Sequence, residues 1–343
     1  MAGNGQEGLE VFESVRPPLT VTDMKAREEI RRSAGTQFDP AVVESFLMIP
    51  LDIIERSGAA PSADPCFPMP NPLALHTWTL DTTPLGDVLR IARKTGWEAV
   101  ELRRIDFARA REAGRSAEEV LAQVGASGLA VTCIGVELGW MFAEGAERRR
   151  LLAAFSESCA WAAALGCSRV MSPVDRGQGD IARAAASIRE VGDVAAAHGV
   201  RLALEMNFRA EQFNTLSRIR EVLARAGDPH CGLLVDTYHL QRSGGSATDL
   251  EDLAPEEIAY VQYSDAPASG LPPGVAMDRL PPGRGVVPFA PIFRVLLGSK
   301  GYAGPLSYGG AESHGLGPRS RGGRARGPGR QPGRPAGVRR GRA

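Results

Sequence analysis

Two short apolar runs that end in side chains capable of metal or acid–base chemistry are the most informative part of the sequence. The run 202–207 contains Glu205, and the run 233–239 contains Asp236 and His239. A buried parallel strand has this pattern when its C-terminal end carries functional side chains. Because a buried carboxylate is costly unless it is paired or bound to a metal, we expect Glu205 and Asp236 to share one site.

Gln262, in the apolar run 258–263, offers a third oxygen donor near a strand end. Carboxylate and amide oxygens without thiolates suit a hard divalent ion, so the sequence predicts a site for Mn²⁺ or Mg²⁺ held by Glu205, Asp236 and Gln262. A satisfied amide between strand and loop is the alternative for Gln262. His239 could contact a substrate, or it could make a hydrogen bond at a helix start or in a loop.

Short apolar runs alternate with longer amphipathic stretches through 69–308, which predicts an α/β fold with a parallel sheet and crossover helices. Eight candidate strands favour a (β/α)₈ TIM barrel, and the GxGxxG turn typical of an open doubly wound sheet is missing. Helices are expected near 84–95, 116–127, 145–165, 179–198, 214–226, 248–254 and 288–299. The expected strands are 73–78, 98–103, 129–135, 169–173, 201–206, 232–236, 258–263 and 305–308.

Two regions lie outside this alternation. Residues 1–68 are expected to form a short helical N-terminal appendage with a linker, too small to hold a core of its own. Residues 309–343 are rich in Gly, Arg and Pro, which predicts a disordered basic tail where the eighth helix should begin. One hypothesis is a one-base shift of reading frame after Tyr308, and the nucleotide sequence of the gene would test it.

Composition and charge exclude several classes of protein. An apolar fraction of 43% without a run long enough to span a membrane, and a polar N-terminus, favour a cytoplasmic protein. The five cysteines form neither a CxxC pair nor a Cys/His cluster, so we expect reduced thiols and no zinc site or disulfide framework. The tail 311–343 holds nine Arg and one Glu but no aromatic residue, which argues against specific nucleic-acid recognition.

The region from about 70 to 308 resembles the xylose-isomerase-like TIM-barrel family of sugar-phosphate isomerases and epimerases. The resemblance rests on 202–207, the Asp-Thr-Tyr-His run at 236–239, the strand 261–265, the Asp-Arg-Leu-Pro-Pro-Gly-Arg-Gly loop at 278–285, and 301–308. It implies a small sugar or sugar phosphate as substrate and a homo-oligomer as a common assembly. It also implies a divalent ion that stabilises an enediolate during proton transfer next to a carbonyl.

In the epimerases of this family, Glu, Asp, His and Glu from successive strand ends hold the ion, and the two glutamates exchange protons with the substrate. Glu205 and Asp236 match this set, whereas Gln262 stands where many members have His, and Gly309 stands where the closing Glu is expected. Proton transfer between two faces of a carbon needs a base on each side. The resemblance therefore predicts an isomerase or epimerase whose activity is impaired by Gly309.

The resemblance assigns His239 to substrate contact and carbonyl polarisation. The planar guanidinium of Arg284, in the 278–285 loop, could bind a hydroxyl or a phosphate, with a solvated loop charge as the alternative. The remaining candidates for the mouth of the site are His76 and Trp78 after the first strand, and Glu101 and Arg103 in the second.

Other functions remain open. A catalytically disabled barrel that only binds sugar, or folds poorly, is the first alternative, and a lyase resembling inosose dehydratase is the second. Endonuclease IV shares the barrel, but its three-metal site needs more histidines than the five of this chain. Residues 28–47 also resemble the C-terminal end of an HD-GYP domain, although the motifs that define that activity are missing.

Overall fold

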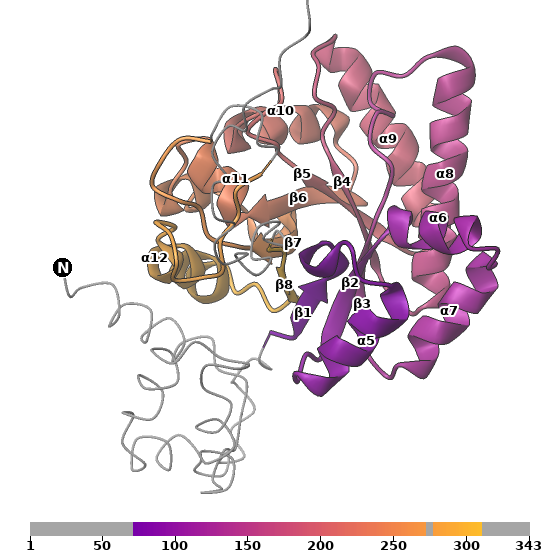
Figure 1. Cartoon of the computed structure of the whole chain (residues 1–343). Coiled ribbons are helices and arrows are strands. Elements are labelled where there is room, and N and C mark those ends of the chain that lie inside the picture. Colours follow the sequence, from indigo (N-terminus) through magenta and orange to yellow (C-terminus); the bar gives the residue numbers. More distant parts are fainter. Residues whose placement is uncertain (1–70, 272–276, 311–343) are drawn as a thin grey trace, which may run out of the picture. The chain divides into compact units, whose positions relative to one another are not determined.

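Eight parallel strands close into a barrel in the computed structural model, which describes residues 71–271 and 277–310. Each strand pairs with its neighbour in sequence, and the last pairs with the first (Figure 1). The predicted TIM barrel is confirmed, because every expected strand overlaps an observed one. The strands are β1 (Leu73–His76), β2 (Ala99–Arg103), β3 (Ala130–Gly135), β4 (Arg169–Pro173), β5 (Arg201–Glu205), β6 (Cys231–Asp236), β7 (Ile258–Tyr263) and β8 (Leu306–Tyr308).

Helices connect the strands on the outside of the barrel (Figure 1). The helices are α5 (Leu85–Lys94), α6 (Arg104–Glu112), α7 (Ala117–Ala126), α8 (Gly145–Ala164), α9 (Ile181–Ala197), α10 (Leu216–Ala226), α11 (Thr237–Arg242) and α12 (Phe289–Phe293). Shorter turns are the 3₁₀ segments Thr77–Leu80, Ala247–Leu250 and Pro255–Glu257 and the π-helical Arg294–Ser299.

The helix predictions were wrong in three places. The expected helix 248–254 is only a 3₁₀ turn, because Pro255 follows closely and few apolar residues face the core. Helix α6 was not predicted, since this charge-rich segment buries only Asp106 and Phe107 and so shows no apolar stripe. The short helix α11 was not among the expected helices, because its six residues are too few to show a helical apolar period.

Glycines follow several of the outer helices. Gly96, Gly128, Gly166 and Gly199 follow α5, α7, α8 and α9 and have φ values of 85°, 69°, 66° and 68°. This left-handed conformation ends a helix at little cost only when the residue lacks a Cβ. Each helix therefore stops just before the strand that follows it.

The core has two layers. The larger layer packs the helices against the outer face of the barrel, and the smaller fills the barrel interior with Cys133, Met171, Ala203, Leu234, Ala259 and Tyr260. Alternate residues of a strand share a face, so Arg201 and Glu205 lie on the same inward face of β5 as Ala203. The two ends of this strand thus carry opposite charges into the two ends of the barrel.

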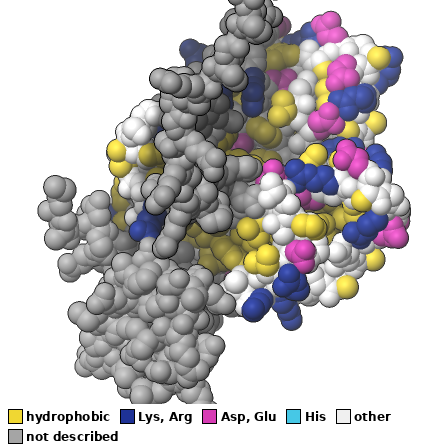
Figure 2. All heavy atoms as spheres, viewed as in Figure 1, with side chains coloured by type: hydrophobic (Ala, Val, Ile, Leu, Met, Phe, Trp, Pro, Cys, Tyr) yellow, Lys and Arg dark blue, Asp and Glu magenta, His cyan; other side chains and the backbone are white. Residues whose placement is uncertain are grey.

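Positive and negative side chains are intermixed over the helices on the right of the molecule (Figure 2). Ion pairs there include Arg104–Glu157 at 2.5 Å and Arg150–Glu137 at 2.6 Å. Within 71–271 and 277–310, no helix is long and apolar enough to cross a membrane. The predicted appendage 1–68, its HD-GYP-like segment and the tail beyond Gly310 lie outside the described residues.

Candidate functional site

Three potential metal ligands meet where β5 and β6 end. Glu205 is the last residue of β5, Asp236 is the last of β6, and His239 lies on the first turn of α11. Each offers a ligand atom, and these atoms lie within 4.8 Å of one another. All three side chains are buried, which is an unusual position for two carboxylates unless a cation accompanies them.

Asp236 organises this cluster through its backbone position. It is the N-cap of α11, and its Oδ1 accepts hydrogen bonds from the backbone N–H groups of Tyr238, at 2.7 Å, and His239, at 3.3 Å. This cap fixes the first turn of the helix and so directs His239 toward Glu205. His239 Nε2 lies 3.7 Å from Glu205 Oε1.

Arg279 is a buried member of the candidate site that the sequence did not indicate. Its Nη1 lies 2.8 Å from Asp236 Oδ2 and donates a hydrogen bond to Ser264 Oγ at 2.8 Å. The guanidinium carbon also lies 4.5 Å from the centre of the Tyr238 ring and 5.5 Å from that of Trp78. The 278–285 loop was singled out in the sequence, but nothing there distinguished Arg279 from the exposed Arg284.

The electrostatics of the cluster separate the roles of its members. Burial, and then the charge of Asp236, raise the pKa of Glu205 well above its usual range. Burial acts most strongly and raises the pKa of Asp236, but Arg279, His239 and Glu205 together hold that pKa below its usual value. Burial lowers the pKa of His239 to about 3, so the imidazole is neutral and can coordinate a metal.

A second buried group lies around Glu101, in the middle of β2. Gln262 Nε2 donates a hydrogen bond to Glu101 Oε1 at 2.7 Å, and His76 Nε2 lies 3.4 Å from the same oxygen. Burial raises the pKa of Glu101 to about 7 and lowers that of His76 to about 3. Gln262 is the register partner of Asp236, so the amide joins this group to the metal-ligand cluster.

The other predicted mouth residues are placed less centrally. Arg103, at the end of β2, is held by Asp81 at 2.6 Å and donates from Nε to Thr77 Oγ1 at 3.2 Å. Trp78 packs over Arg279, with its ring edge-on to His76 at 6.4 Å between centroids. Arg284 is exposed on the loop before α12.

Asp265, just after β7, anchors the loop that carries Arg279. Its Oδ2 accepts a hydrogen bond from Gly285 N at 2.7 Å, and its Oδ1 accepts one from Val287 N at 2.9 Å. A Cβ on Gly285 would lie 2.1 Å from the carbonyl oxygen of Ala266, so only glycine permits this approach. The loop therefore returns to the barrel mouth in one defined position.

Gly309, directly after β8, faces the Glu101 group. Among the described residues, the atoms nearest to a Cβ built on it belong to His76, with Nδ1 at 3.6 Å and Cβ at 3.8 Å, which is ordinary contact. A longer side chain at this position would therefore start beside His76 without a clash. The position suits the closing glutamate that the family resemblance led us to expect.

The sequence and structure of this chain are similar to those of known proteins. A family model described as xylose isomerase-like TIM barrel matches residues 89–323. A xylose isomerase domain protein from Alicyclobacillus acidocaldarius is 26% identical, with a TM-score of 0.61 over 71% of this chain and 91% of that one. The IOLI protein, solved with a zinc atom, has a TM-score of 0.64 over 71% and 90%, and its 17% identity indicates a shared fold alone.

Curated relatives match over shorter stretches. A 3-dehydroshikimate dehydratase of Pseudomonas aeruginosa is 31% identical over 151 residues, which cover 42% of this chain and 22% of that protein. An inosose isomerase of Halalkalibacterium halodurans is 28% identical over 123 residues, 35% of this chain and 43% of that protein. The chain thus spans less than half the length of either relative.

Proposed function

Because the chain belongs to the xylose isomerase-like TIM-barrel family, we propose that it is a metal-dependent sugar isomerase or epimerase acting by proton transfer next to a carbonyl. The observation that carries the proposal is the buried cluster of Glu205, Asp236 and His239 at the strand ends. The fold is shared with proteins solved as L-ribulose 3-epimerase and D-allulose 3-epimerase, at 22% and 19% identity. The proposed substrate is a ketose or its phosphate, and the proposed location of the reaction is the cytoplasm.

The residues of the cluster fit a divalent ion. Glu205, Asp236 and His239 would hold it, with the Gln262 amide as a weaker fourth donor. The two carboxylates suit Mn²⁺ or Mg²⁺, and the neutral imidazole favours Mn²⁺ of the two, because Mg²⁺ prefers oxygen donors. When bound, such an ion would polarise the substrate carbonyl and the adjacent hydroxyl and stabilise the enediolate.

Glu205 is the proposed base on one face of the substrate carbon. Its raised pKa means that the carboxylate holds a removed proton readily, which a general base must do before it returns that proton. His239, with one ring nitrogen on the ion, would donate a hydrogen bond from the other to a substrate hydroxyl, and Arg279 would help to keep Asp236 ionised. His76, Trp78, Glu101, Arg103 and Arg284 are the proposed substrate-binding residues.

Gly309 removes the base that epimerisation requires on the opposite face. With Glu205 alone, a proton leaves and returns on the same face, so the configuration of the carbon is retained. We therefore propose that this chain binds metal and exchanges the substrate proton but epimerises poorly. In the limiting case it is a catalytically disabled barrel that only binds sugar.

Dehydration of a cyclic polyhydroxy ketone is a second candidate. Elimination of water needs one base for the proton and an acid for the departing hydroxyl, and no base on the opposite face. Gly309 is compatible with that chemistry, and the 31% identical relative is named 3-dehydroshikimate dehydratase. A lyase of this kind would use the same Glu205 and the same ion.

Calorimetry with Mn²⁺ tests the site, comparing the wild type with Glu205→Ala and Gly309→Glu. We expect the wild type to bind one ion, Glu205→Ala to lose that binding, and Gly309→Glu to bind more tightly. Glu205→Gln keeps the side-chain volume and is the matched control for packing. Binding that survives both substitutions of Glu205 would overturn the proposed ligand set.

Incubation with ketoses in D₂O then separates the functions. Proton exchange next to the carbonyl without epimerisation in the wild type, and epimerisation in Gly309→Glu, is the result expected for an epimerase that lacks one base. Formation of a conjugated product from 3-dehydroshikimate or an inosose, followed by ultraviolet absorbance, would instead identify a lyase. Neither exchange nor elimination with bound Mn²⁺ would mean that the barrel is catalytically disabled.

A further inference from the structure

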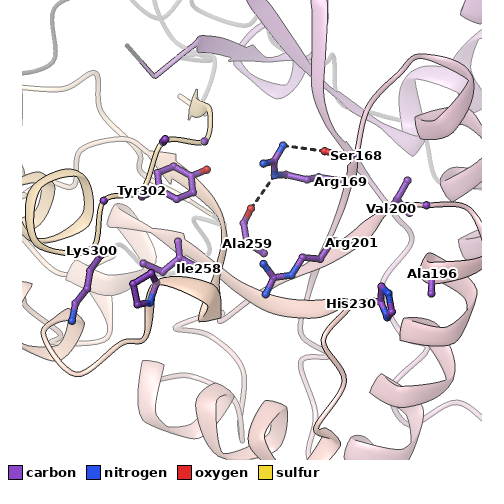
Figure 3. A pocket seen from close by; sticks show the side chains of 15 residues that line it. Ser168, Arg169, Ala196, Val200, Arg201, His230, Ile258, Ala259, Lys300 and Tyr302 are labelled. Atoms are coloured by element: carbon purple, nitrogen blue, oxygen red, sulfur yellow. Dashed lines mark hydrogen bonds between the residues drawn. The ribbon is translucent and has the colours of Figure 1, made fainter. Parts of the chain in front are cut away.

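A cavity of about 570 Å³ opens at the end of the barrel opposite the Glu205 cluster (Figure 3). It is lined by residues at the starts of β4, β5 and β7 and by the segment before β8. Four of the lining side chains are Arg169, Arg201, His230 and Lys300, and none is a carboxylate. A volume of this size is typical of a pocket for a small metabolite.

Two arginines lie side by side in this cavity. Arg169 and Arg201 are register partners on β4 and β5, and both side chains extend toward Ala259 (Figure 3). Arg169 Nε donates to the Ala259 carbonyl oxygen at 3.1 Å, and Arg201 Nη2 donates to that of Glu256 at 2.5 Å. Like charges at neighbouring register positions repel each other unless an anion lies between or beside them.

The charges of these arginines are not neutralised within 71–271 and 277–310. Over those residues, neither Arg169, Arg201 nor Lys300 lies within ion-pair distance of a carboxylate, and Lys300 Nζ bonds only to the carbonyl oxygen of Glu251. Arg201 Nε is buried without a hydrogen-bond partner. A buried N–H donor of a charged group is costly to leave unpaired, so an acceptor is missing.

The residues around Arg201 leave space for its charged guanidinium group. A Cβ on Gly232 of β6 would lie 2.5 Å from Arg201 Nη2, so glycine leaves space for the guanidinium. Burial, together with the charge of Arg169, lowers the pKa of Arg201. An anion bound beside the two arginines would offset both the burial of Arg201 and its repulsion from Arg169.

We propose that this cavity binds a phosphate dianion, free or as part of a small phosphomonoester, between the guanidinium groups of Arg169 and Arg201. The planar donors of arginine match the oxygens of phosphate, and His230 and Lys300 add positive potential at the rim. The site is independent of the metal chemistry, because Met171 and Ala203 separate it from the Glu205 cluster.

Calorimetric titration of the full chain with inorganic phosphate and with glycerol 3-phosphate, at ionic strength held constant with NaCl, tests the proposal. We expect saturable binding that weakens at least about tenfold in Arg169→Gln and in Arg201→Gln. Arg90→Gln, which removes an exposed arginine on α5, and Glu205→Ala should bind as the wild type does. Tighter binding of glycerol 3-phosphate would identify a phosphomonoester, and equal affinity would identify phosphate itself.

Absence of saturable heat would overturn the site, as would unchanged affinity in both arginine variants or loss of binding in Glu205→Ala. If circular dichroism shows that a variant is unfolded, the wild type provides a second readout. Phenylglyoxal modifies accessible arginines, and phosphate should protect peptides that contain Arg169 and Arg201 but not the peptide with Arg90. Equal labelling with and without phosphate contradicts the proposal.

Discussion

At the scale of single residues, the candidate metal site is a balance between buried charges. Arg279 beside Asp236 favours the ionised carboxylate, whereas no arginine in the described part of the chain pairs with Glu205, and the pKa of Glu205 is raised. Arg279 is in turn held between the Tyr238 and Trp78 rings. Removing any one charge therefore leaves another one buried and uncompensated.

Arg279→Met should lower the free energy of unfolding of the metal-free protein by about 3 kcal/mol, because it leaves the Asp236 carboxylate without its cation. Mn²⁺ should restore part of this loss. The control is Arg220→Met, which breaks a partly exposed ion pair with Glu257 and should cost less than about 1 kcal/mol. Urea unfolding measures both, and equal losses would contradict a special role for Arg279.

Glu101→Gln tests the other buried carboxyl through pH. The pKa of Glu101 is raised to about 7 from an ordinary 4.5, so the folded state keeps a proton that the unfolded chain releases between these values. This group therefore reduces stability as pH rises through that window, by up to about 3 kcal/mol. The Glu101→Gln variant lacks this pH-dependent loss. The free energy of unfolding of the variant, relative to that of the wild type, should therefore increase from pH 4.5 to pH 7.5.

Urea unfolding of the metal-free proteins across this pH range measures the difference. The lowered pKa values of His76 and His239 act in the opposite sense, because their unfolded forms take up protons as pH falls below about 6.5. The contribution of His239 is present in both proteins and largely cancels, whereas that of His76, whose Nε2 lies 3.4 Å from Glu101 Oε1, is part of the measured difference. A stability difference that is flat with pH would mean that Glu101 is ionised at little cost in the fold.

At the scale of elements, the ends of two strands and one loop set the geometry of the candidate metal site. The ends of β5 and β6 supply Glu205 and Asp236, and the cap of α11 directs His239. The loop after β7 delivers Arg279 only because Asp265 accepts hydrogen bonds from its returning backbone. The site thus depends on the backbone of a loop as well as on the rigid barrel.

Gly285→Ala should destabilise the protein by about 2 kcal/mol, because the new Cβ meets backbone at 2.1 Å and displaces the loop. Gly270→Ala is the matched control, since no atom of the residues that the structure describes lies within 4 Å of a Cβ there. The loss should be less than additive with Arg279→Met, because both changes disturb the same contacts. Thermal unfolding of the single and double variants checks this, and full additivity would separate the loop from the arginine.

At the scale of the whole molecule, β5 links two oppositely charged ends of one barrel. Glu205 faces the C-terminal mouth, Arg201 faces the N-terminal mouth, and Ala203 between them belongs to the apolar interior. A cation bound at one end and an anion at the other would each stabilise the folded state without direct contact. Stability should therefore respond to each ligand separately.

Mn²⁺ should raise the thermal midpoint of the whole chain, because an ion that binds only the folded state adds about 2.7 kcal/mol at a hundredfold excess over Kd. The increase should shrink as pH falls, since Glu205 must lose its proton to bind the ion and its pKa is raised. Differential scanning fluorimetry with and without EDTA measures the effect. An equal increase in Glu205→Ala would place the ion elsewhere.

The sequence by itself determined the barrel and the two strand ends that carry Glu205 and Asp236, because alternating apolar runs and helices are local patterns. It also selected His239 as a substrate-contacting candidate, Gln262 as a candidate ligand and Glu101 as a candidate for the mouth of the site. Only the tertiary structure brought Arg279 to Asp236 and set Arg169 beside Arg201, because contacts between distant residues follow from barrel closure and register. Charge pairing of this kind leaves no periodic signal in a sequence, whereas burial does.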